Sequence, residues 1–128
     1  MEPNLSMQTA ASLLAVSAVG GLVMAGIRFS GKPHPPTWLA MLHGFLSAAA
    51  VTLLLYAQFT VGLPTLALSA TVLFVVAALG GIVMNLNYHW KLLPLPKGLV
   101  VVHALIAVTG FVLLLAAIWT MHAPAAGQ

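Results

Sequence analysis

The feature that most constrains the fold of this chain is its near-absence of charge. No Asp, Glu, Lys or Arg occurs between Lys32 and Lys91, and only 4% of the 128 residues are charged, whereas 62% are hydrophobic. A soluble domain carries about a quarter charged residues. The sequence therefore predicts an integral membrane protein that contacts the lipid bilayer along most of its length.

Four apolar runs account for nearly all of the chain, at about residues 7–29, 37–59, 65–86 and 98–119. Each run is close to the ~20 residues that a helix needs to cross a bilayer, and none shows the alternation of a strand. Prolines and glycines cluster between the runs, where helices begin or the chain turns. We therefore predict an all-α protein in which residues 1–128 form a single transmembrane four-helix bundle.

The second half of the chain repeats the first with a period of 60. Laying residues 10–60 over 70–120 without a gap gives 16 identities in 51 positions. Chance would give roughly a tenth for so Leu-, Ala- and Val-rich a composition. We predict two tandem two-helix repeats, which keep their orientation and are related by a pseudo-twofold axis along the membrane normal. With that axis at the bundle centre, the second and fourth helices lie diagonally opposite.

The identities include two histidines, His43 and His103, and two glycines, Gly20 and Gly80. Counted from the ends of the runs next to the basic connections, the histidines lie about 8–9 Å deep and the glycines about 9–13 Å deep, within about one helical turn of each other. A polar side chain is costly in lipid, so its presence twice at one depth predicts that both imidazoles meet one ligand. Two imidazoles from opposing helices suit a haem iron, and the glycines would leave room for the porphyrin.

The four basic residues, Arg28, Lys32, Lys91 and Lys97, all fall in or beside the first and third connections. These connections lie on the same side of a four-helix protein. The positive-inside rule makes that side cytoplasmic, so both termini should lie on the periplasmic side of a bacterial inner membrane. The same four side chains are candidates to bind haem propionates.

Several kinds of function are excluded by composition. The chain has no cysteine, which excludes disulfides, thiolate chemistry and iron–sulfur clusters. The sequence pI near 9.8 reflects four basic residues against one acid rather than a basic patch, so nucleic-acid binding has no support. No carboxylate–histidine or nucleophile constellation indicates a hydrolase.

The order glycine, histidine, glycine, histidine over four successive helices resembles the haem-binding core of b-type membrane cytochromes, and more loosely the cytochrome b561-like bundles. The resemblance implies that His43 and His103 are the axial iron ligands and that Gly20 and Gly80 flank the ring. It covers the four spans but rests on few positions, so it is a likeness of architecture.

That resemblance also implies how many haems to expect. Those cytochromes usually place a second histidine fourteen residues further along each ligand helix, where this chain has Ala57 and Ala117. One haem b near the cytoplasmic side is therefore expected. A lone haem does not carry electrons across the whole membrane, so we expect an electron-transfer subunit that joins other redox subunits or self-associates. A quinone or superoxide oxidoreductase, with a quinone as a further ligand, is the alternative activity.

Two alternative functions are open for the histidine pair. Intramembrane histidines also bind bacteriochlorophyll magnesium, one histidine for each pigment. A structural subunit without a cofactor would instead use both imidazoles to hydrogen-bond neighbouring helices, with the glycines as close helix contacts. The remaining histidines, His34, His89 and His122, lie at or beyond helix ends and are expected to be solvated.

Overall fold

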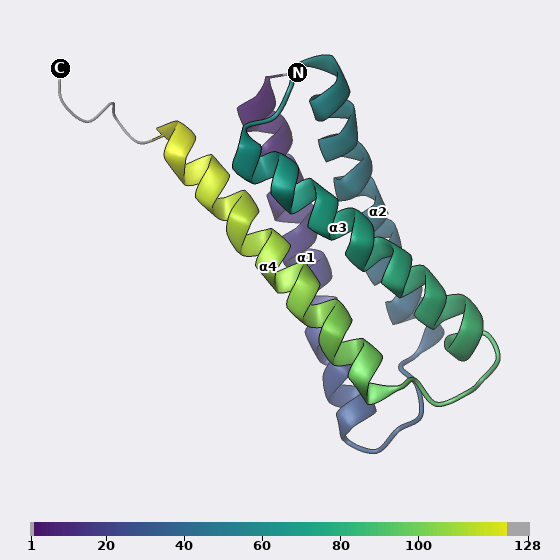
Figure 1. Cartoon of the computed structure of the whole chain (residues 1–128). Helices are drawn as coiled ribbons and strands as arrows, with labels where there is room; N and C mark the ends of the chain where they lie inside the picture. The colour runs from purple at the N-terminus through teal and green to yellow at the C-terminus, as the bar shows by residue number, and fades with distance from the viewer. Residues whose placement is uncertain (1, 123–128) are drawn as a thin grey trace, which may run out of the picture.

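A computed structural model of the protein describes residues 2–122. Its helices are α1 (Pro3–Phe29), α2 (Thr37–Thr60), α3 (Thr65–Met84) and α4 (Lys97–His122), and a short π-helical turn, η1 (Asn85–His89), continues α3 (Figure 1). The helices follow the four apolar runs, although α1 begins earlier than expected. The predicted all-α, four-helix bundle is confirmed.

Proline and glycine set the helix boundaries. Pro36 and Pro64 occupy the positions directly before α2 and α3, where their missing N–H groups leave no intrahelical bond unmade. After α2 the chain reverses at Gly62, whose φ of 77° lies in the left-handed region that glycine adopts without strain. This short connection makes α2 and α3 antiparallel neighbours.

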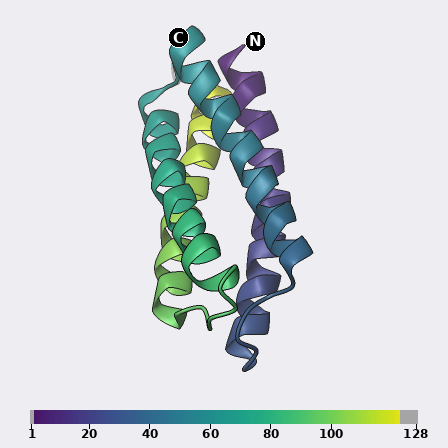
Figure 2. The ribbon, with the colours of Figure 1, turned by 90° about the vertical axis from the view of Figure 1, so that its right-hand side faces the viewer.

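The helices pack as a closed ring in chain order. Neighbouring pairs are α1–α2, α2–α3, α3–α4 and α4–α1, with the closest packing within α1–α2 and α3–α4 (Figures 1 and 2). The start of α1 meets the end of α4, where the Asn4 side-chain nitrogen lies 3.2 Å from His122 Nε2. α2 and α4 therefore lie diagonally opposite and run parallel, as do α1 and α3.

All four helices are long and apolar enough to cross a membrane. Counting η1 with α3, they contain 24 to 27 residues, or about 36–40 Å of helix, against a hydrocarbon core of about 30 Å. Large apolar side chains such as Leu22, Phe45 and Val112 are exposed on the outer surface of the bundle, where lipid would cover them. The chain is thus an integral membrane protein by architecture.

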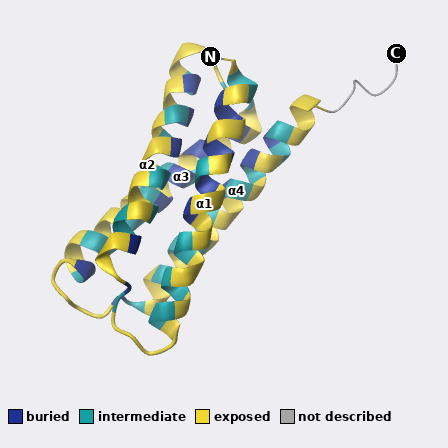
Figure 3. Ribbon diagram, turned by 180° about the vertical axis from the view of Figure 1, so that it is seen from behind, coloured by how far each residue is buried: buried dark blue, intermediate teal, exposed yellow. Residues whose placement is uncertain are grey.

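The packed core occupies mainly one end of the bundle. The fully buried side chains gather toward the end at which α1 begins, and the dark blue positions follow the same trend (Figure 3). They include Met7, Leu54, Phe74 and Leu114. Further along, toward the basic connections, fewer residues are buried, and both His43 and His103 are only partly buried. The half of the bundle that contains the two histidines is therefore the less completely packed half.

Candidate functional site

His43 and His103 meet across the bundle. His43 projects from α2 and His103 from α4, and their ring centroids are 6.2 Å apart with an interplanar angle of 69°. Because α2 and α4 lie diagonally opposite, the pair lies between α1 and α3. The structure thus brings together the two residues that the repeat singles out, 60 positions apart in the chain.

A backbone carbonyl fixes the tautomer of each ring. His43 Nδ1 lies 2.8 Å from the carbonyl oxygen of Ser17, and His103 Nδ1 lies 2.9 Å from that of Ala77. A carbonyl oxygen can only accept, so each Nδ1 must donate its proton. Each neutral imidazole therefore has its lone pair on Nε2, the arrangement that protein carbonyls impose on metal-binding histidines.

Ser17 adds a second set of contacts on the His43 side only. This side chain is 2% exposed, and its hydroxyl lies 2.9 Å from His43 Nδ1, 3.1 Å from the His43 carbonyl oxygen and 2.6 Å from Ser47 Oγ. Sixty residues on, both serines are replaced by alanines, Ala77 and Ala107. The two imidazoles are therefore held unequally, and His43 has the more extensive hydrogen-bond network.

Replacing Ser17 by alanine should destabilise the protein by about 1 kcal/mol, because the partly buried Ser47 hydroxyl and the His43 carbonyl each lose a partner. The matched control is Ser12→Ala, since Ser12 is exposed and its hydroxyl bonds only the Gln8 carbonyl of its own helix. The free energy of unfolding in detergent measures both effects. Equal losses for the two variants would show that the Ser17 network adds no stability.

Paired glycines on α1 and α3 lie against the two imidazole rings. A Cβ added at Gly21 would lie 3.1 Å from His43 Cε1, and one at Gly81 would lie 3.5 Å from His103 Cε1. One added at Gly80 would lie 3.8 Å from His103 Nδ1, whereas Gly20 lies against the Cβ of His43. The glycines therefore leave space for the imidazole of the next helix, a role that the sequence pattern does not predict, since it predicts clearance for a porphyrin or a close helix contact.

Gly21→Val should displace the His43 ring, because the contact at 3.1 Å leaves no room for a branched side chain. We expect a loss of about 1–3 kcal/mol in stability and a weakened ligand site. Gly26→Val on the same helix is the control, since a Cβ there meets nothing within 4 Å. Unfolding titrations of both variants check the expectation, and an equal tolerance of both changes would contradict it.

The basic residues lie at the same end of the bundle as the histidines, but each has its own surroundings. Arg28 Nε donates to the Leu95 carbonyl at 2.7 Å and so ties the end of α1 to the segment before α4. The Lys97 ammonium lies 5.4 Å from the centre of the Phe29 ring. Lys32 and Lys91 are exposed. Arg28 and Lys97 therefore contact the connections and Phe29 rather than the two imidazoles.

A second histidine pair is not predicted by the sequence. His89 is 4% exposed, so the expectation that it is solvated is wrong. Its ring lies 5.2 Å from that of His34, and its Nε2 lies 3.2 Å from Thr37 Oγ1. His89 ends the π-helical turn η1, and no pattern in the sequence predicts that this turn would bring it against the connection before α2.

The site offers a metal only two protein ligands. Across residues 2–122, no group of three or more His, Cys, Asp or Glu side chains is arranged to hold a metal ion. A metal at His43 and His103 would need further donors, such as the four nitrogens that a porphyrin carries. In comparisons with protein-family models, curated proteins and solved structures, the chain gives no significant match.

Proposed function

We propose that the protein is a membrane b-type cytochrome that holds one haem between His43 and His103. The observation that carries the proposal is the close pair of imidazoles in an edge-to-face arrangement, each with its Nδ1 proton donated to a carbonyl. Nitrogen ligands bind transition metals at about 2 Å, so an iron shared by two imidazoles sets the ring centres on the order of 6 Å apart. The distance of 6.2 Å agrees with that requirement.

The packing of the bundle supports the same function. The core is complete beyond the histidines, at the end where α1 begins, whereas Gly20, Gly80 and both imidazoles are partly exposed. A planar cofactor needs space of this kind between helices. A histidine pair serving only as a helix contact would not need incomplete packing around it, because interiors otherwise close to high density.

The chain's own groups would hold the cofactor and limit its reactions. His43 and His103 would hold the haem iron, and Gly20 and Gly80 would leave room for the cofactor beside them. A haem bound in this way would supply reversible one-electron transfer between ferric and ferrous iron. Because two protein side chains would hold the iron, the site favours electron transfer over oxygen activation. The surrounding apolar side chains would keep water from the iron.

The basic end of the bundle completes the proposal. Arg28, Lys32, Lys91 and Lys97 are the cations available there to pair with carboxylates of the cofactor, once Arg28 and Lys97 exchange their present contacts. By the positive-inside rule this end faces the cytoplasm, with both termini on the periplasmic side of a bacterial inner membrane. A single haem near one surface needs an electron partner, so the protein would act as a subunit of a redox complex or as an oligomer.

The ring separation argues against a pigment on each histidine. Two bacteriochlorophylls, each bound to one imidazole, would both have to fit between rings whose centres are 6.2 Å apart. One shared macrocycle fits that space better than two. The structural alternative, a subunit without cofactor, explains the bond that each Nδ1 makes to a carbonyl but gives no role to the two Nε2 atoms.

Absorption spectroscopy of the detergent-purified protein, oxidised and then reduced with dithionite, tests the proposal. Low-spin b haem would give a Soret band that shifts on reduction and sharp α and β bands. A near-infrared band would indicate bacteriochlorophyll instead. A colourless protein from a haem-replete host would support the structural alternative.

A further inference from the structure

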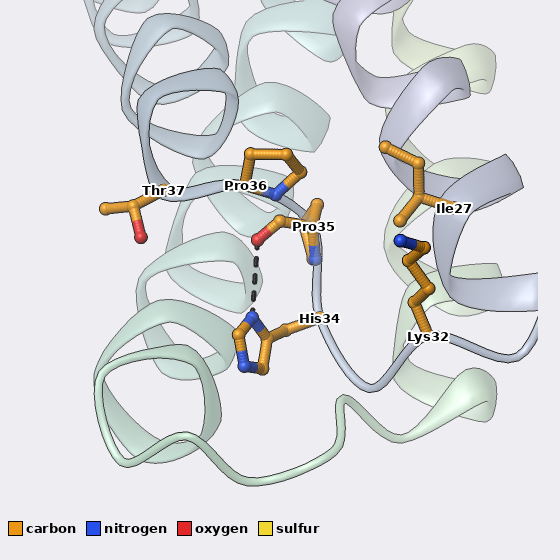
Figure 4. A pocket seen from close by; sticks show the side chains of 6 residues that line it. All are labelled: Ile27, Lys32, His34, Pro35, Pro36 and Thr37. Carbon is orange, nitrogen blue, oxygen red and sulfur yellow. Dashed lines mark hydrogen bonds between the residues drawn. The ribbon is translucent and has the colours of Figure 1, made fainter.

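Two neighbouring pockets lie on the α1–α2 side of the bundle and share two lining residues. The first, of about 360 Å³, lies at the basic end, with Ile27 and Lys32 on one side and His34, Pro35, Pro36 and Thr37 on the other (Figure 4). The second, of about 440 Å³, runs along the seam between α1 and α2. Ile27 and Pro36 line both pockets, so the two pockets are adjacent.

The seam pocket is apolar and faces lipid. Its outer walls are largely exposed side chains of the two helices: Val16, Val19 and Val23 on α1, and Trp38, Leu42 and Leu46 on α2. Ser17, Gly20 and His43 line the pocket too, so the seam adjoins the candidate haem site. From Ile27 to Val16 the groove extends along α1 for eleven residues, or about 16 Å. One leaflet contributes half of a hydrocarbon core of about 30 Å, so the groove is about as long as one leaflet is deep.

The positive charge around the first pocket favours a ligand with an anionic head group. Lys32 brings an ammonium group to one side of the pocket, and the His34 imidazole lies on the other side (Figure 4). Arg28, Lys91 and Lys97 make the same end of the bundle positive, and the single acid of the chain, Glu2, lies at the opposite end. Basic pockets at the cytoplasmic ends of membrane helices favour anionic head groups.

We infer that this combined site binds one anionic glycerophospholipid, with the phosphate at Lys32 and His34 and an acyl chain in the α1–α2 seam. A detergent-like or quinone head would not use the ammonium group of Lys32 as a phosphate does. The repeat supplies an internal contrast, because the positions 60 residues on are Leu92 and Pro94. The second half of the chain therefore lacks the cationic part of the site.

Native mass spectrometry of the full chain in a neutral detergent tests the inference by titration with phosphatidylglycerol and with phosphatidylcholine. We expect one phosphatidylglycerol to bind more tightly than phosphatidylcholine. Lys32→Gln should weaken phosphatidylglycerol about five-fold and leave phosphatidylcholine unchanged, since a surface cation contributes on that order. Lys91→Gln, the control, removes an exposed lysine that does not line the pocket.

A second pair of variants tests the groove. Val23→Trp fills the seam and should weaken both lipids, whereas Val83→Trp, the equivalent change on α3 at a similarly exposed valine, should not. Far-ultraviolet circular dichroism checks that both tryptophan variants keep their helices. The comparison of Lys32→Gln with Lys91→Gln does not depend on that result. Equal losses for Lys32→Gln and Lys91→Gln would overturn the inference in favour of diffuse surface charge. Displacement of the lipid by an equimolar quinone would overturn it too.

Discussion

Replacing either His43 or His103 by alanine should abolish the low-spin haem spectrum, and haem content per chain should fall by more than about tenfold. The expectation follows from the pairing of the two rings, because each supplies one of only two protein ligands. Loss even of a residue that only orients a metal ligand costs 10–100-fold in affinity, so loss of the ligand itself should cost more. Pyridine haemochrome assays on the purified variants measure the haem content.

His122→Ala is the control for these variants. It also removes an imidazole from α4, but this one is exposed and lies at the opposite end of the helix, where it contacts Asn4. Its haem content should equal that of the wild type. A His43→Ala, His103→Ala double variant with an unchanged spectrum would refute the ligand assignment.

The second large effect is expected far from the histidines, in the packed end of the core. Leu54 and Leu114 are fully buried and stand 60 residues apart, at matching positions on α2 and α4. Replacing either by alanine should destabilise the bundle by about 2–5 kcal/mol, because the lost contacts leave a cavity. In lipid such contacts matter more than hydrophobic transfer, since the lipid tails are as apolar as leucine.

Leu105→Ala provides the matched control, because Leu105 is on α4 as well but is 62% exposed on the outer surface. Its loss should change the stability by no more than about 0.5 kcal/mol. Reversible unfolding in mixed micelles with increasing denaturing detergent measures the free energies. A comparable loss at Leu105 and Leu114 would mean that the packed end does not hold the bundle together.

Much of the fold could be predicted because few alternatives exist for a chain with so little charge. Four apolar runs of spanning length allow little besides four transmembrane helices, and short connections make consecutive helices antiparallel. The diagonal arrangement of α2 and α4 follows from this order, and the structure confirms it. The tandem repeat itself stays a prediction, although it singled out both residues of the central pair.

The features that the sequence does not predict depend on tertiary contacts that no local pattern encodes. His89 becomes buried because a π-helical turn carries it against the connection that holds His34, more than fifty residues earlier in the chain. In the sequence, nothing distinguishes Ser17 from the other small residues of its apolar helix. Its contact with His43 exists only because α2 packs against α1. The confinement of the core to one end likewise depends on how the helices diverge, which composition does not specify.

The most direct test of the central claim is the low-temperature electron paramagnetic resonance spectrum of the oxidised protein, read together with the number of haems per chain. If His43 and His103 share one iron, the spectrum will be that of a low-spin ferric haem with two imidazole ligands, at one haem per chain. A high-spin signal, two cofactors per chain or no bound haem would contradict the account.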